Sequence, residues 1–305
     1  NPIGEKLTRL DSEAAAAAID GHIASPLGIS VEEAAEAIIR VANAKMAGAI
    51  RLISIERGHD PKRFAAMPFG GGGALHAGAL VREIGLAAAI VPRFPGVNSA
   101  LGCVMSDLRH DEVRTLNRML DTLDCKVLTA MIAEINASSE EVIKRSKASI
   151  DGLEAVIELD MLYLGQTHAV AVPLSVSDSG ITTEAIRAAF DASYRRTYGR
   201  LLENIPVRVL NLRLSVIGKR PEVDIASLAR GERAASADDC HLADQKIFAG
   251  GQWHDGAIID RLRLPAGAVV NGPCLLVQPD ATIYVDPGLA ARVDDLGNII
   301  IKEQE

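Results

Sequence analysis

A run of four glycines is the feature of this sequence best suited to hold a ligand. It consists of Gly70, Gly71, Gly72 and Gly73, between a predicted strand at 63–69 and a predicted helix at 74–84. Because glycine has no Cβ atom, a flat or anionic molecule could lie directly against this backbone. The start of the helix adds free N–H groups and the positive end of its dipole. A nucleotide therefore fits this segment, although close packing of strand on helix also calls for glycine.

The run differs from the two common phosphate-binding motifs. It matches neither G-x-x-x-x-G-K-[ST] nor G-x-G-x-x-G in their expected settings, so neither a P-loop nor a Rossmann site is predicted. The polar residues nearest to the motifs are His76, His59, Asp60 and Ser99. His76 could donate to a phosphate or substrate oxygen, or it could tie neighbouring loops together. Asp60 precedes Pro61, a setting in which an aspartate usually forms a turn.

The composition excludes several classes of protein. The chain has 305 residues, is 48% hydrophobic and carries a formal net charge of -8, so it can bury a substantial core and has no basic surface for nucleic acid. No apolar run approaches the roughly 20 residues that span a membrane. Four scattered cysteines favour a reducing cytoplasm, and seven histidines show no metal-ligand spacing. The first residues, Asn1 and Pro2, indicate a truncated or processed start.

The elements around the glycines predict a β-loop-α-β unit. A long helix is expected at 30–57, because Ser30 and Glu33 have the spacing of a capping box and apolar residues then recur at helical spacing. The strand before the glycines and a second strand at 88–91 should be parallel, joined by a right-handed crossover. Residues 92–102 are a predicted loop.

The rest of the chain predicts a mixed α+β region and a β-rich end. An antiparallel hairpin (155–163 and 168–174), a helix (183–198) and a long strand (207–217) follow a partly solvated helix at 125–147. The end of the chain predicts a small β-sandwich or barrel-like module, with short strands at 258–264, 274–278, 282–285, 291–293 and 299–302.

These patterns give an α/β and α+β fold class and divide the chain into four expected segments. The segments are an α/β part with the glycine run at 1–150, an α+β region at 151–220, a linker or loop at 221–245, and a β module at 246–305.

Several motifs, in this order, resemble those of a known family. They are ERGHDPKRF at 56–64, FGGGGALHA at 69–77, PGVNSALG at 95–102, YLGQ at 163–166, and the terminal pair Gly272-Pro273 and Asp286-Pro287-Gly288. Together they resemble the hydantoinase A/oxoprolinase family. That family includes N-methylhydantoinase, 5-oxoprolinase and the nucleotide-binding subunits of acetone and acetophenone carboxylases.

The resemblance implies an actin-like, sugar-kinase-like ATPase fold, in which ATP lies between two ribonuclease-H-like lobes. By this carry-over the four glycines contact the adenosine side of ATP, and His76 is a further candidate for contact with the cofactor. The segments that hold the phosphates and Mg²⁺ belong to the front half of the family's proteins, for which this sequence has no match. The family often carries alanine within the glycine run, where this chain has Gly72, and proline after it, where the chain has Ala74 and Leu75. These differences are expected to be tolerated.

The resemblance also implies an activity. A cytoplasmic enzyme would use ATP to phosphorylate and open a cyclic amide or imide, together with a hydantoinase B-like subunit or domain, in an oligomer. Two alternatives stay open, namely the nucleotide-binding subunit of an ATP-dependent ketone carboxylase and a non-catalytic assembly module. The 305 residues alone are expected to be inactive, and their catalytic residues are unknown.

Overall fold

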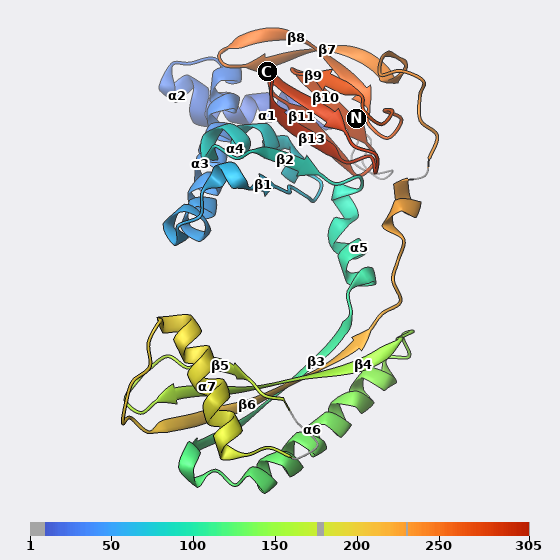
Figure 1. The fold of residues 1–305 in the computed structure, drawn as a ribbon. Coiled ribbons are helices and arrows are strands. Elements are labelled where there is room, and N and C mark those ends of the chain that lie inside the picture. The colour runs from blue at the N-terminus through green and yellow to red at the C-terminus, as the bar shows by residue number, and fades with distance from the viewer. Residues whose placement is uncertain (1–9, 176–179, 230, 305) are drawn as a thin grey trace. The chain divides into compact units, whose positions relative to one another are not determined.

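The chain forms two compact units in the computed structural model, which describes residues 10–175, 180–229 and 231–304 (Figure 1). The first unit contains the described residues up to Val104 and those from Asp224 onward. The second unit, Met105–Val223, is inserted between these two stretches of sequence.

Helices open the first unit. They are α1 (Ser12–Ile19), a π-helical turn (Asp20–Ala24), α2 (Ser25–Leu27) and α3 (Val31–Ile53). The predicted capping box of α3 is confirmed, since the Glu33 N–H donates to Ser30 Oγ at 3.1 Å and the Ser30 N–H donates to Glu33 Oε2 at 2.8 Å. The described residues contain no helix long and apolar enough to cross a membrane.

A five-stranded sheet joins both stretches of the first unit. The expected parallel pair is confirmed as β1 (Ala65–Ala66) and β2 (Ala88–Val91), connected through a 3₁₀ turn and α4 (Ala77–Ile84). Beside β2 lie three strands from the end of the chain, in the order β1-β2-β13-β12-β9. Their bounds are Val269–Asn271 for β9, Leu289–Val293 for β12 and Ile299–Glu303 for β13.

A second, four-stranded sheet packs against the first. Its order is β11-β10-β8-β7, with bounds His241–Ala249 for β7, Gln252–Asp260 for β8, Cys274–Gln278 for β10 and Ala281–Val285 for β11. Both sheets and α4 bury side chains in one core, which includes Val81, Val91, Leu276, Ile283, Leu289, Ile299 and Ile301. The C-terminal strands therefore depend on β2 and α4 for their core and do not form a module of their own.

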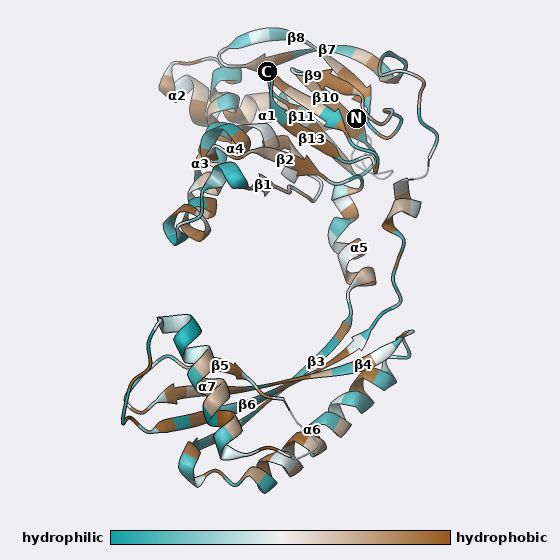
Figure 2. Ribbon diagram, in the orientation of Figure 1, coloured by the Kyte–Doolittle hydropathy of each residue, from teal (hydrophilic) through white to brown (hydrophobic). Residues whose placement is uncertain are grey.

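The second unit is an antiparallel sheet packed with two helices. The sheet order is β3-β6-β4-β5, with bounds Leu108–Met119 for β3, Gly152–Tyr163 for β4, Val170–Pro173 for β5 and Val207–Lys219 for β6. The helices are α6 (Cys125–Arg145) and α7 (Thr183–Tyr198), and α6 shows mixed hydrophilic and hydrophobic residues along its length (Figure 2). The predicted hairpin, both helices and the long strand are confirmed. The mixed α/β and α+β fold class is also confirmed.

The structure differs from the expected elements in several places. The strand expected at 258–264 is wrong, because β8 already ends at Asp260. The helix expected at 30–57 ends at Ile53, and the strand expected at 63–69 is limited to Ala65–Ala66. Residues 92–102 were expected as a loop, but a 3₁₀ turn (Pro95–Val97) leads into helix α5 (Asn98–Met105), because a proline is favourable in a first helical turn. Strand β7 begins within the expected linker at 221–245. The boundaries between the compact units lie at 104/105 and 223/224, whereas the expected segments ended at 150, 220 and 245. Strand β3 and helix α6 belong to the second unit because they pack with β6. The end of the chain belongs to the first unit because β13 pairs with β2.

Candidate functional site

The glycine run forms a loop whose four residues have different roles. Gly70 has a φ of +84°, which favours glycine, and its N–H donates to the Pro95 carbonyl at 2.7 Å. A Cβ atom at Gly71 would lie 3.6 Å from the Asp280 carbonyl oxygen, which is ordinary contact, and one at Gly72 would meet nothing within 4 Å. The backbone conformation at position 70 therefore favours glycine. At Gly71 and Gly72 the absence of a side chain leaves the main chain accessible.

A second loop and a residue far along the chain hold this segment in place. The N–H of Gly96, next to Pro95, donates to Asp280 Oδ2 at 2.9 Å. A Cβ atom at Gly96 would lie only 2.5 Å from the Asp280 carbonyl oxygen, so the two backbones can approach only because Gly96 is a glycine. The second and third sequence motifs are thus brought together, with Asp280 as their common support.

A buried arginine, Arg261, holds the segments around Asp280 through hydrogen bonds. Arg261 is 3% exposed, and its guanidinium donates to the carbonyls of Val91 at 3.2 Å, Pro92 at 2.6 Å and Gly297 at 3.3 Å. It also donates to the Arg93 carbonyl and to the side chain of Gln278, which in turn donates to Asp280. Burial, with a smaller effect from the charge of Arg93, lowers the pKa of Arg261 to about 10, which leaves it a cation at neutral pH.

A cavity of about 710 Å³ lies beside the helical turn that follows the glycine run. The N-terminal half of α3 gives one wall, and a second comes from the 3₁₀ turn and α4 through His76 and its neighbours. The tip of the β7–β8 hairpin gives a third wall. Leu275, Tyr284 and Asp286 line the side formed by β10, β11 and the turn after β11, which we call the floor. This is the volume expected of a small-molecule site.

His76 connects the turn after the glycines to α3. Its Nδ1 lies 2.7 Å from Oδ1 of Asn43, which is 5% exposed. Because that amide oxygen can only accept, Nδ1 carries a proton, and in the neutral ring Nε2 is then an acceptor. Of the two roles expected for His76, the tie between neighbouring segments is observed. Its ring also lines the cavity, so contact with a ligand stays a prediction.

The floor carries two polar atoms without a protein partner. The Tyr284 hydroxyl and Asp286 Oδ2 are buried and accept or donate no hydrogen bond within the described part of the chain. A Cβ atom at Gly78 of α4 would lie 2.6 Å from Leu289 Cδ1 and nearer still to Asp286 Oδ2, so Gly78 makes room for this carboxyl group. Burial raises the pKa of both residues, and the negative charge of Asp286 adds to the effect on Tyr284.

The buried carboxyl group of Asp286 predicts a pH-dependent difference between the parent and Asp286→Asn. Burial raises the pKa of Asp286 above 3.8, although Arg82 partly opposes this. A carboxyl group with a raised folded pKa contributes stability that is fully present below its unfolded pKa and is lost as pH rises through the folded pKa. From about pH 4 upward, urea unfolding should show the parent losing stability relative to Asp286→Asn. Exposed Asp295→Asn is the control, and a pH-independent difference at Asp286 would contradict this expectation.

The other polar residues singled out from the sequence have local roles. Asp60 accepts a hydrogen bond from the Lys62 N–H at 3.0 Å and caps a 3₁₀ turn, which confirms its turn role. The ring of His59 packs edge-on against Phe64 with centroids 5.7 Å apart. Ser99 is exposed on α5. None of the three is among the described residues that line the cavity.

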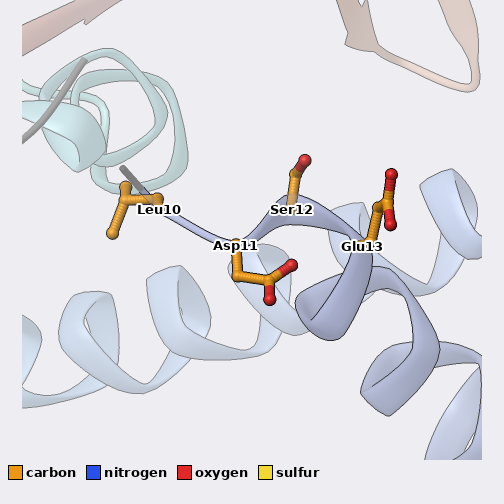
Figure 3. A pocket seen from close by; sticks show the side chains of 4 residues that line it. All are labelled: Leu10, Asp11, Ser12 and Glu13. Atoms are coloured by element: carbon orange, nitrogen blue, oxygen red, sulfur yellow. The ribbon is translucent and has the colours of Figure 1, made fainter. Parts of the chain in front are cut away.

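A second hollow, of about 370 Å³, lies at the start of α1 and has a simpler lining. Its described lining residues are Leu10, Asp11, Ser12 and Glu13, and the side chains of Ser12 and Glu13 point away from that of Asp11 (Figure 3). The Asp11 carboxylate accepts a hydrogen bond from the Ala14 N–H at 2.9 Å as the N-cap of α1. These four described residues are consecutive in the sequence, so among the described residues the hollow brings together no groups from different elements.

Comparison with known families identifies the chain. The hydantoinase/oxoprolinase model matches residues 3–112, and the model of the hydantoinase/oxoprolinase C-terminal domain matches residues 117–303. The chain belongs to the hydantoinase/oxoprolinase family. The resemblance carried by the sequence motifs is therefore confirmed.

Relatives within the hydantoinase/oxoprolinase family include proteins of stated activity. The chain is 31% identical to caprolactamase subunit alpha of Pseudomonas jessenii over 290 residues, which cover 94% of the chain and 42% of the relative. It is 25% identical to 5-oxoprolinase 1 of Arabidopsis thaliana, covering 90% of the chain and 21% of that protein. The nucleotide-free structure of acetone carboxylase matches all of the chain and 44% of its own with a TM-score of 0.81 and 23% identity, which shows a shared fold. The chain thus spans less than half the length of these relatives.

Sequence reasoning missed several residues of this site. Arg261, Asn43, Tyr284 and the carboxyl group of Asp286 were not predicted as site residues, although Asp286 belongs to a motif of the family. The Gly250-Gly251 pair between two strands was an available signal for the hairpin that covers the cavity, since both glycines have positive φ. Among residues 10–175, 180–229 and 231–304 no three acidic, histidine or cysteine side chains group as a metal site.

Proposed function

We propose that this chain is the C-terminal part of an ATP-dependent enzyme that opens a cyclic amide or imide. The observation that carries the proposal is the similarity, over nine-tenths of the chain, to caprolactamase subunit alpha and to 5-oxoprolinase 1, whose names denote cyclic amides as substrates. In the proposed reaction the amide oxygen attacks the terminal phosphoryl group of ATP and ADP leaves. Water then adds to the activated carbon, the ring C–N bond breaks, and inorganic phosphate is released with the ring-opened amino acid. Positioning and charge neutralisation carry most of the catalysis in such a transfer.

The glycine run is proposed as the wall for the adenosine part of ATP. Gly71 and Gly72 support this role, because their backbone is exposed and no side chain stands between it and a ligand. Gly70 and Gly73 then set the path of the loop, and His76 offers Nε2 as an acceptor at its end. The phosphates and Mg²⁺ are proposed to be held by the part of the longer relatives that this chain does not match.

A ketone carboxylase subunit is the second candidate function. The observation in its favour is the shared fold with acetone carboxylase, with a TM-score of 0.81 over the whole chain. A third candidate, a non-catalytic assembly module, agrees with the partial coverage of every relative described above. N-methylhydantoinase activity falls within the first proposal as one choice of ring.

The proposed enzyme works in a complex in the cytoplasm. A subunit designation in the name of the caprolactamase relative supports a heteromeric assembly, and we propose a hydantoinase B-like subunit or domain as the partner. Four free cysteines, of which Cys103 is exposed, support a reducing compartment.

The activity is tested with the longer polypeptide and its partner. Stimulation of ATP turnover by a lactam or imide, with formation of the ring-opened amino acid, would support the first candidate. Stimulation only by a ketone with bicarbonate would support the carboxylase. No ATP turnover with either substrate would leave the assembly module as the function.

Replacement of Gly71 by valine tests the adenosine wall. A Cβ atom at Gly71 lies at ordinary contact distance from Asp280, so the fold should accept the change with a small effect on melting temperature. The added methyl groups would stand where a ligand meets the backbone, and calorimetry should show ATP affinity reduced about tenfold or more, equivalent to 1.4 kcal/mol. Gly48→Val, at an open position of α3, is the matched control. Unchanged affinity with a lowered melting temperature would instead make the glycines a structural turn.

A further inference from the structure

The cavity floor offers hydrogen-bonding atoms that the protein leaves unused. The Tyr284 hydroxyl can donate one hydrogen bond and accept another, and Asp286 Oδ2 is a second group without a partner in the described part of the chain. A buried polar group without a partner destabilises the fold. A ligand that reaches the floor and supplies both a donor and an acceptor would relieve this.

The charges around the cavity are close to balanced. Glu32 and Glu36 line it together with Arg40 and Arg82. Burial raises the pKa of the fifth charged residue, Asp286, and so opposes its ionisation. The lining therefore gives no strong preference for an ionic ligand of either sign, which favours an uncharged one.

The walls favour a largely apolar molecule. Ile39 of α3, Leu75 beside the glycine run, Phe248 of β7 and Leu275 of β10 come from four different elements and line the same space. Apolar walls with a few placed polar groups are the usual lining of a small-molecule site. Ring faces can pack on these side chains while one ring edge reaches the floor.

The hairpin that covers the cavity is fixed in place. Glu36 accepts hydrogen bonds from the N–H groups of Gly250 and Gly251 at the hairpin tip. His254 Nε2 lies 3.0 Å from the Ala249 carbonyl, which holds the base of the same turn. A site whose walls are already tied together loses less entropy on binding.

We propose that this cavity binds an uncharged ring through a planar edge with a hydrogen-bond donor next to an acceptor. Tyr284 and Asp286, which line the floor, would meet that edge, and His76 lines the adjoining wall. This inference rests on the proposed function, which supplies two such rings: the amide edge of the cyclic substrate and the base of ATP. Both share the same recognition chemistry, and the experiment separates them.

The test measures binding of three ligands to this chain by calorimetry. They are ε-caprolactam, N-methylcaprolactam, which lacks the N–H donor, and adenosine. Saturable binding of ε-caprolactam but not of its N-methyl form, with no binding of adenosine, would identify the substrate ring. Binding of adenosine alone would identify the base of ATP. The proposal is overturned if none of the three binds at millimolar concentration, or if the N-methyl form binds as well as its parent.

Tyr284→Phe locates the binding at this cavity. The variant removes an unpartnered hydroxyl, so its melting temperature should not fall, while affinity for the bound ring should drop about fivefold to tenfold. Ala79→Met, which fills the cavity from α4, should abolish binding. Tyr198→Phe, at an exposed tyrosine of the second unit, is the control.

Unchanged affinity in both cavity variants would overturn the assignment. A second measurement uses the longer enzyme carrying Tyr284→Phe. If a lactam stimulates its ATP turnover as strongly as it does that of the parent, the assignment of this cavity is also overturned, while the proposed function stands.

Discussion

Replacement of Arg261 by methionine is expected to lower the free energy of unfolding of the first unit by about 3–5 kcal/mol. Methionine fills a similar volume but donates no hydrogen bond. The carbonyls of Val91, Pro92 and Gly297, 3.3 Å or less from the guanidinium, would lose their arginine donor inside the core. Urea unfolding followed by the fluorescence of Trp253 measures the effect, because the single tryptophan lies on β8 of this unit.

Arg263→Met is the matched control for this change. Arg263 is exposed two residues further along the chain, and its replacement should alter stability by less than about 0.5 kcal/mol. Arg261 also supports Gln278 and Asp280, which hold the loop beside the glycine run, so ATP affinity should fall together with stability. A stable Arg261→Met protein would mean that the loops keep their positions without the buried cation.

Local signals in the sequence were sufficient for most helices and many strands. The capping spacing of Ser30 and Glu33 located the start of α3, and α7 was predicted with its observed bounds, 183–198. The parallel pair around the glycine run was also predicted. In each case the information lies within a few residues of the element, in caps, glycine stops and apolar periodicity.

The parts that could not be predicted depend on residues distant in the sequence. The pairing of β13 with β2 joins segments more than 200 residues apart, and nothing local marks the edge of β2 that receives it. The cavity has the same origin, since its walls come from α3, α4, the β7–β8 hairpin and the floor strands. Asp286 was part of a recognised motif, yet its place against Gly78 of α4 required the fold. For this reason the glycine run was found from sequence and the site beside it was not.

Replacement of Gly272 by alanine is expected to destabilise the first unit by about 3 kcal/mol or more. An added Cβ atom would lie 2.7 Å from the Val285 carbonyl oxygen and nearer still to that of Asp286. Both atoms belong to backbone at the end of β11, where β10 pairs with it through Cys274 and Val285, so no side-chain rotation can relieve the clash. The approach of these two segments explains why Gly272-Pro273 and Asp286-Pro287-Gly288 occur as a pair of motifs.

Gly72→Ala is the control, because its Cβ atom would meet nothing within 4 Å and its φ of -108° suits any residue. Its unfolding followed by Trp253 fluorescence should match that of the parent. Since Asp286 follows the strand that Gly272 approaches, Gly272→Ala should also displace the cavity floor and weaken binding of the ring that occupies it. Equal melting temperatures for Gly272→Ala and the parent would show that β10 and β11 can separate at this end without loss. In that case the close approach of Gly272 would not be needed to position Asp286 at the cavity floor.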